Sequence, residues 1–210
     1  MIKTLLLSFL LMLNAGGEEF LNEVALYQKQ SYYKDKVYAE HDWKSFYALK
    51  EANQVVNPDN YDLHLLNAAI FFSTNKVRAG KKLDALIYSG PLRDAAVVHS
   101  QQMVDKKFFD HFNNKTRKLR TPEDRMVMFG VTQAQAMGEN IDFNNIQMPS
   151  KTSYIQLADK IVDAWMHSAP HRKTMLSKGY SHLGCAGVFE AKDKTGYRYI
   201  KATQDYSLQR

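Results

Sequence analysis

The chain has 210 residues, of which 45% are hydrophobic, so it is long and apolar enough for one domain with a real core plus an appendage. Its single cysteine, Cys185, excludes a scaffold held by internal disulfides, and the apolar run around it favours a buried, unreactive thiol. The formal net charge is +6, and residues 61–210 carry 22 basic and 14 acidic side chains, a balance of +8.

The first 17 residues have the order of a secretory signal peptide. Lys3 precedes an almost unbroken apolar run over residues 4–13, which is too short to span a bilayer. Small residues follow, so we expect cleavage after Gly17 or after Ala15 and a mature protein that is secreted or periplasmic, not transmembrane. Outside the cytoplasm, its basic domain would meet lipid headgroups or anionic envelope polymers, and we expect no nucleic acid partner.

Residues 18–60 are predicted to form an N-terminal helical extension. Val24 and Tyr27 share one face of a first helix, and Trp43 and Phe46 recur at helical spacing in a second. The turn sequence at residues 57–60 is the expected boundary, which leaves residues 61–210 as the main domain.

The main domain begins with helical periodicity and ends with strands. Pro91 and Pro122 each stand where a helix begins, and Thr121 with Asp124 has the form of a capping box. The predicted helices lie around residues 63–77, 91–103, 122–129, 157–165 and 169–176. Residues 183–191 and 197–206 are rich in β-forming side chains and read as a hairpin, which gives an α+β plan in layers.

Three polar residues in distinctive settings are the candidate functional groups. Glu139 stands between Gly138 and Asn140, His111 follows two phenylalanines, and His171 lies shortly after Trp165. A glutamate and two histidines that converge can bind a cation, hold a water molecule or anchor a polar ligand. His99, on an apolar helix face, is expected to be a core histidine with its hydrogen bonds satisfied.

From about residue 62 to residue 206 the chain resembles the CAP superfamily, named for cysteine-rich secretory proteins, antigen 5 and pathogenesis-related proteins, and in particular its bacterial SCP-like branch. The resemblance rests on short motifs in a fixed order: Asn75-Lys76-Val77-Arg78, Phe108-Phe109-Asp110-His111, Asp124-Arg125, Gly138-Glu139-Asn140-Ile141, Trp165 with Ser168-Ala169-Pro170-His171-Arg172, and Thr203-Gln204-Asp205-Tyr206. It implies a three-layer α-β-α sandwich with a small antiparallel sheet and a cleft over that sheet.

The resemblance also implies the residues of that cleft, where the family commonly has two histidines and two glutamates, sometimes with a divalent metal. His111 and Glu139 match two of these positions, whereas Ser168 and Lys201 stand at the other two. Bacterial members offer a His-Arg pair instead, here His171 and Arg172. The implied ligand-binding set is therefore His111, Glu139, Ser168, His171, Arg172 and Lys201.

Only His111, Glu139 and His171 remain to hold a metal such as zinc, with an open fourth position. Strand alternation would point Lys201 toward Glu139, and an ion pair there would disfavour a cation in the cleft. Arg172 has two interpretations, since it could hold an anionic group or brace Asp163 or another local acid.

Three functions follow from these residues. The first is a binding module that holds a lipid, a peptide or an envelope glycan fragment in the cleft. The second is a hydrolase or protease-like enzyme in which Glu139 is the general base for a water molecule oriented by His111 and His171. The third is an envelope protein whose aromatic N-terminal helices recruit a partner. No Ser-His-Asp or Cys-His pattern supplies a nucleophile, so the binding module is favoured.

Overall fold

The computed structural model describes residues 17–25, 27–132 and 134–209, so the expected signal peptide lies outside the described residues except for Gly17. Within these ranges the strands form one four-stranded sheet in the order β1-β3-β4-β2. The strands are β1 (Ile87–Tyr88), β2 (Ala136–Gln147), β3 (His182–Phe189) and β4 (Tyr197–Leu208). The predicted hairpin is β3 and β4, which pair antiparallel, and β4 also pairs antiparallel with β2.

Two strands were absent from the sequence-based prediction. The alternation of β2 is obscured by polar residues at 140, 142, 144 and 145, of which Asn140 is buried and the others are half-buried. β1 has only two residues and pairs parallel with β3, so the sheet is mixed instead of purely antiparallel.

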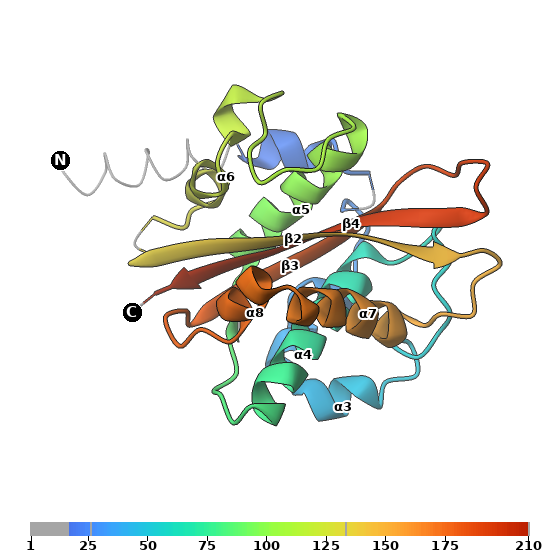
Figure 1. The fold of residues 1–210 in the computed structure, drawn as a ribbon, viewed down its shortest axis with the longest axis horizontal. Helices are drawn as coiled ribbons and strands as arrows, with labels where there is room; N and C mark the ends of the chain where they lie inside the picture. The colour runs from blue at the N-terminus through green and yellow to red at the C-terminus, as the bar shows by residue number, and fades with distance from the viewer. Residues whose placement is uncertain (1–16, 26, 133, 210) are drawn as a thin grey trace.

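Helices cover both faces of the sheet, which confirms the three-layer α-β-α sandwich (Figure 1). On one face lie α5 (Gly90–Asp105) and α6 (Pro122–Met128), joined through the short 3-10 helix η2 (Arg117–Leu119). The other face is covered by α4 (Leu63–Gly80), α7 (Tyr154–His167) and α8 (Ala169–Met175).

Side-chain caps explain where several helices begin. The carboxylate of Asp62 accepts hydrogen bonds from the first backbone N–H groups of α4. Thr121 and Asp124 form the predicted capping box of α6, and Ser153 and Gln156 form another at the start of α7. The capping box of Thr121 and Asp124 fixes the residue at which α6 begins, and therefore the position of Arg125 one turn later.

The N-terminal extension is less regular than predicted. It contains η1 (Tyr32–Lys34), α2 (Lys36–Glu40) and α3 (Trp43–Tyr47), which are too short to be stable alone. The aromatic side chains hold it to the domain instead, since the Phe46 ring lies 4.5 Å from that of Phe72. Tyr38 stacks on Tyr88 at 3.6 Å between ring centroids.

One arginine ties the extension to the main domain. Arg93 of α5 is buried and donates to the carbonyl oxygen of Lys34 and to the hydroxyl of Tyr27. It also makes ion pairs with Asp35 and with its own neighbour Asp94. The extension and the main domain therefore share one hydrophobic core, and the aromatic residues predicted to recruit a partner are largely packed inward.

The core also contains Cys185, a buried free thiol on β3, as the sequence predicts. Burial raises the pKa of this thiol well above its usual value, which keeps it unreactive. None of the helices in the described ranges is both long enough and apolar enough to cross a membrane.

Candidate functional site

Glu139 is the centre of a buried polar cluster at the edge strand. Its side chain, on β2, points into the layer of α5 and α6 and is 1% exposed. Oε1 lies 2.7 Å from Nδ1 of His111, and Oε2 lies 2.5 Å from Nη2 of Arg125. Burial alone would raise the pKa of Glu139, but the hydrogen bond from His111 and the charges of His99 and Arg125 hold it below its usual value. Glu139 is therefore an ionised carboxylate with both oxygen atoms engaged.

Arg125 supplies the compensating positive charge. It is fully buried on α6 and also donates to the backbone oxygens of Leu119 and His111. These two bonds hold the loop before α6 against the cluster. Arg125 belongs to a motif of the family resemblance, but the sequence offered no reason to place it beside Glu139, which is 14 residues away.

His111 is the member of the cluster that reaches solvent. It lies in the loop between α5 and η2, and its side chain is 40% exposed. The hydrogen bond to Glu139 raises the pKa of His111, and the partial burial of the ring opposes this. Because Nδ1 is engaged, Nε2 is the ring atom left for a ligand or a proton.

Asp205 and His99 complete the cluster, and neither was predicted as a site residue. Asp205 lies opposite Glu139 in the β2–β4 ladder and is fully buried, and its oxygen atoms have no hydrogen-bond partner in the described part of the chain. Burial, and then the charge of Glu139, raise the pKa of Asp205 well above its usual value. Burial lowers the pKa of His99 to about 4, and its Nε2 is 3.1 Å from the carbonyl oxygen of Asp110. His99 is buried as expected, but the expectation that its hydrogen bonds are satisfied is wrong, since Nδ1 has no partner in the described part of the chain.

His171 lies on the opposite side of β2, in α8. The amide of Asn140 donates to its backbone oxygen at 3.1 Å, which holds the start of α8 against the edge strand. Burial and then the charge of His111 lower the pKa of His171, so the two histidines influence each other across the edge strand. The structure therefore joins His111 to Glu139 directly, whereas His171 approaches from the other helical layer and makes no hydrogen bond to Glu139.

Ser168 and Arg172 lie near His171 and do not contact Glu139. Ser168 is the C-cap of α7 and the N-cap of α8. Its N–H donates to the carbonyl oxygen of Trp165 in α7, and its carbonyl oxygen accepts from the N–H of Arg172 in α8. Arg172 is exposed and donates to the carbonyl oxygen of Met166 at 2.7 Å. The proposed bracing of Asp163 by Arg172 is wrong, since Asp163 pairs with His167 instead.

The expected ion pair between Lys201 and Glu139 is also wrong. Nζ of Lys201 lies 2.8 Å from Oε1 of Glu190 and 2.8 Å from the carbonyl oxygen of Met103. The reason is the strand register: Lys201 lies opposite Phe143, four residues along β2 from Glu139, or about 14 Å. The two side chains share a face of the sheet but are too far apart to meet.

The residues present do not fit the divalent metal found in some relatives. In the described ranges, no group of three or more His, Cys, Asp or Glu side chains is close enough to hold a metal ion. The lone pairs of Glu139 are taken by Arg125 and His111, and Lys201, which stands where the family usually has a histidine, is paired with Glu190 instead. The set of His111, Glu139 and His171 is thus not assembled for zinc.

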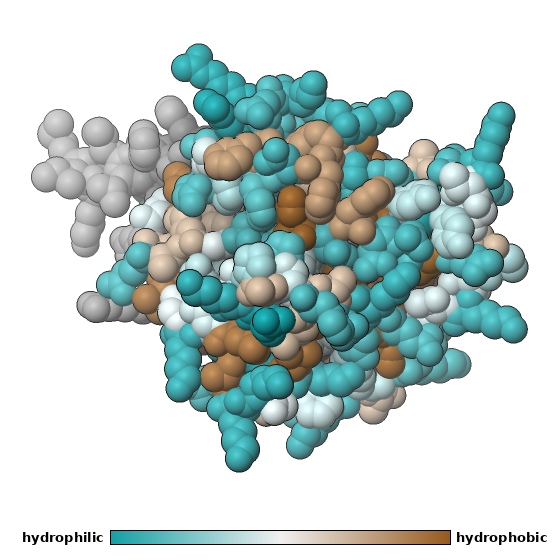
Figure 2. Space-filling model, viewed as in Figure 1, coloured by the Kyte–Doolittle hydropathy of each residue, from teal (hydrophilic) through white to brown (hydrophobic). Residues whose placement is uncertain are grey.

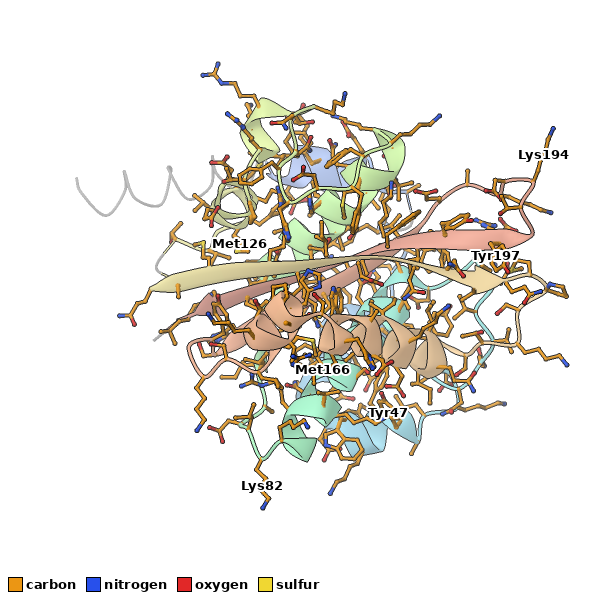
Figure 3. The ribbon with its side chains drawn as sticks, viewed as in Figure 1. Tyr47, Lys82, Met126, Met166, Lys194 and Tyr197 are labelled. Atoms are coloured by element: carbon orange, nitrogen blue, oxygen red, sulfur yellow. The ribbon has the colours of Figure 1, made fainter. Side chains whose placement is uncertain are left out.

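An aromatic groove follows the same face of the sheet toward the β3–β4 hairpin. Phe109 and Phe143 are about half exposed, with ring centroids 5.8 Å apart, and Phe143 stacks on Tyr199 at 5.4 Å. The groove has a volume of about 730 Å³ and is also lined by Phe108, Lys107 and Lys201. Figure 2 shows that apolar side chains are scattered among polar ones over this view of the molecule, and Figure 3 shows Tyr197 near the hairpin end of β4.

The fold and this cluster define a class of protein, namely three-layer α-β-α domains with a His-Glu pair at the edge of a small sheet. The chain belongs to the CAP family, the cysteine-rich secretory protein family, whose model matches residues 71–206.

Two curated proteins of Bacillus subtilis are similar to this chain. The uncharacterized membrane protein YlbC is 32% identical over 111 residues, which cover 53% of this chain and 28% of YlbC. The uncharacterized protein YkwD is 34% identical over 115 residues, which cover 55% of this chain and 39% of YkwD. The matched part thus spans well under half of either relative.

Among solved structures, an extracellular protein containing a SCP domain from Bacillus anthracis has the same fold. It superposes with a TM-score of 0.53 at 24% identity, over 73% of this chain and 44% of that chain.

Proposed function

We propose that this chain is an exported CAP-domain protein that binds a small ligand beside His111, in the groove lined by Phe109 and Phe143. Export is supported by the signal-peptide pattern and by the extracellular protein of similar fold from Bacillus anthracis. The observation that carries the binding role is an exposed histidine, fixed by a buried carboxylate, that lies two residues after the half-exposed Phe109 of the groove.

The ligand would meet His111 and not Glu139. Glu139 is almost fully buried and both of its oxygens are engaged, so its contribution is to fix the ring of His111 and to keep a charge behind it. A polar group of the ligand would bond to Nε2 of His111, while an apolar part would lie on Phe109 and Phe143. A lipid, a peptide or an envelope glycan fragment each has both parts.

Native mass spectrometry of the protein purified from the envelope of the cells that make it tests this proposal. We expect extra ligand mass on the wild type and its loss in His111→Ala and in Phe143→Ala. Val127→Ala is the matched control, because Val127 is a similarly exposed apolar residue on α6, outside the groove. Wild-type protein without bound mass, or equal loading of all variants, would overturn the proposal.

A hydrolase is the second candidate, and the 2.7 Å contact between His111 and Glu139 favours it. In that case His111, not Glu139, would be the general base for a water molecule, since only His111 reaches solvent. Glu139 would orient the imidazole and stabilise its protonated form. Release of peptides from fluorescein-labelled casein by the wild type, and its loss in His111→Ala but not in His167→Ala, would support this candidate. Equal rates in both variants would exclude it.

A further inference from the structure

The backbone of β2 presents hydrogen-bonding groups away from the sheet. The register of β2 and β4 continues past Gln147 and Tyr197 to place Met148 opposite Gly196, and Met148 donates to the carbonyl oxygen of Gly196. This pair is therefore a hydrogen-bonded pair of the antiparallel ladder, and such pairs recur at every second residue. Even-numbered residues of β2 thus bond to β4, and odd-numbered residues point their N–H and C=O groups outward. Nothing in the described sheet pairs with that outer edge.

Local groups cap this edge at both ends but not in the middle. The hydroxyl of Tyr180 donates to the carbonyl oxygen of Met137. At the other end, the Asn145 N–H is bonded by the side chain of Asn144, and its carbonyl oxygen accepts from Nζ of Lys160. Between these caps, the outward groups of Glu139 and Ile141 have no hydrogen-bond partner in the described part of the chain.

The exposed part of Glu139 is its backbone. The residue as a whole is half-buried, although its side chain is only 1% exposed. An edge strand with open backbone groups is a template for another strand, and proteins usually block such edges. Here the outward backbone groups of Glu139 and Ile141 are left without such a block, and Ile141 as a whole is 6% exposed.

We propose that the ligand is an extended peptide of another protein, which pairs with residues 139–143 as an additional strand. This inference rests on the proposed function and names its ligand class. A strand supplies a donor and an acceptor about every 6.8 Å, the spacing of the odd-numbered residues of β2. A lipid tail has no such groups, and a glycan does not repeat them at the backbone period.

The caps also decide against a second copy of this chain. Pairing of two β2 strands over their full length would require the contacts of Tyr180 and Lys160 to break at both ends. The open stretch suits a peptide that forms a short ladder. Its side chains would alternate between the groove of Phe109 and Phe143 on one face and α8 with His171 on the other.

Selection from a phage-displayed library of random heptapeptides, followed by amide hydrogen exchange, tests the proposal. We expect enriched sequences with alternating β-forming residues and no proline at the pairing positions. The synthetic peptide should slow exchange of the Glu139 and Ile141 amides at least tenfold. The Asn140 and Asp142 amides, already bonded to β4, are the internal control and should not change.

N-methylation of the peptide provides a test that leaves the protein intact. Methyl groups on the amides that face β2 should weaken binding at least tenfold, while methyl groups on the alternate amides should have little effect. Equal effects of both patterns, protection elsewhere on the protein, or no enrichment would overturn the peptide proposal. A lipid or glycan mass on the native protein would also overturn it, yet would leave the proposed binding function standing.

Discussion

Glu139 and Asp205 are direct neighbours across the β2–β4 ladder, and both side chains lie on the same buried face of the sheet. Arg125 forms its ion pair with Glu139 alone. Two adjacent buried carboxyl groups with one compensating cation cannot both ionise readily, so the charge resides on Glu139 and the proton on Asp205. The opposite directions of their pKa shifts express this division.

Asp205→Asn should therefore stabilise the protein at neutral pH. The raised pKa of Asp205 means that the folded state retains a proton that the unfolded state has lost. The contribution of Asp205 to wild-type stability thus falls as pH rises above about 4, until the raised pKa is reached. Asparagine has nearly the same shape as aspartate but does not titrate. Urea unfolding should therefore show a higher free energy of unfolding for Asp205→Asn than for the wild type at pH 7, and this difference should shrink toward pH 4.

The control for this experiment is Asp84→Asn, in which the altered carboxyl group is exposed. We expect Asp84→Asn to follow the wild type at each pH. An Asp205→Asn gain of the same size at pH 4 and pH 7 would show that Asp205 is not the titrating group.

His111 should titrate at higher pH than His171 or His182. The hydrogen bond to Glu139 raises the pKa of His111, whereas burial lowers the pKa of the other two. The stabilising contribution of His111 is then complete below its unfolded pKa and is lost as pH rises through the folded value. NMR titration should show the His111 pKa falling in Glu139→Gln, with His182 unchanged as the control. An unshifted His111 would contradict the pairing.

Arg125→Met should cost about 3–5 kcal/mol, because it leaves the carboxylate of Glu139 buried without its cation. The double variant with Glu139→Gln should recover part of this loss, since the uncompensated charge is then gone. Urea unfolding at pH 7 measures both values. The exposed residue Arg120 is the control, and Arg120→Met should remain within about 0.5 kcal/mol of the wild type. Additive costs in the double variant would show that the pair is not coupled.

Local signals in the sequence predicted the helices and the hairpin well. The capping box at Thr121 and the β-forming residues on either side of the 192–196 loop act over a few residues, so they can be read directly. The edge strand β2 was missed because its polar residues obscure its alternation. The error at Lys201 follows from that omission, because its neighbours depend on the register between β2 and β4.

The candidate site was predicted in part for the same reason. The family pattern brought His111 and Glu139 together, and the structure places them in contact. Arg125 and Asp205 act on Glu139 through a helix and a paired strand, and no sequence spacing reports such contacts. Their charges appear only once the three layers are assembled.

Phe46→Ala in the N-terminal extension should destabilise the whole domain by about 3–5 kcal/mol. Phe46 is fully buried and packs on Phe72 of α4, so its removal leaves a cavity in the shared core. Val55→Ala, at an exposed position in the same segment, is the control and should cost little. Unfolding followed by far-UV circular dichroism measures both. A cost for Phe46→Ala below about 1 kcal/mol would indicate that the extension is not part of the core.

Two glycines of β3 should differ sharply in their tolerance of alanine. A methyl group on Gly184 would lie 2.0 Å from the backbone nitrogen of Arg93, so α5 itself would have to move. A methyl group on Gly187 would meet the ends of three side chains, those of Ile200, Ile70 and Leu66, at 3.1, 3.2 and 3.4 Å.

Gly184→Ala should therefore cost about 3 kcal/mol or more, at the upper end for overpacking, and Gly187→Ala less than about 1.5 kcal/mol. Displacement of α5 would also move the loop that carries His111, so the His111–Glu139 hydrogen bond should weaken in Gly184→Ala alone. The NMR pKa of His111 reports this, and it should fall in Gly184→Ala and stay at the wild-type value in Gly187→Ala. Equal stability of the two variants would contradict the close approach of α5 to β3, on which the position of the site depends.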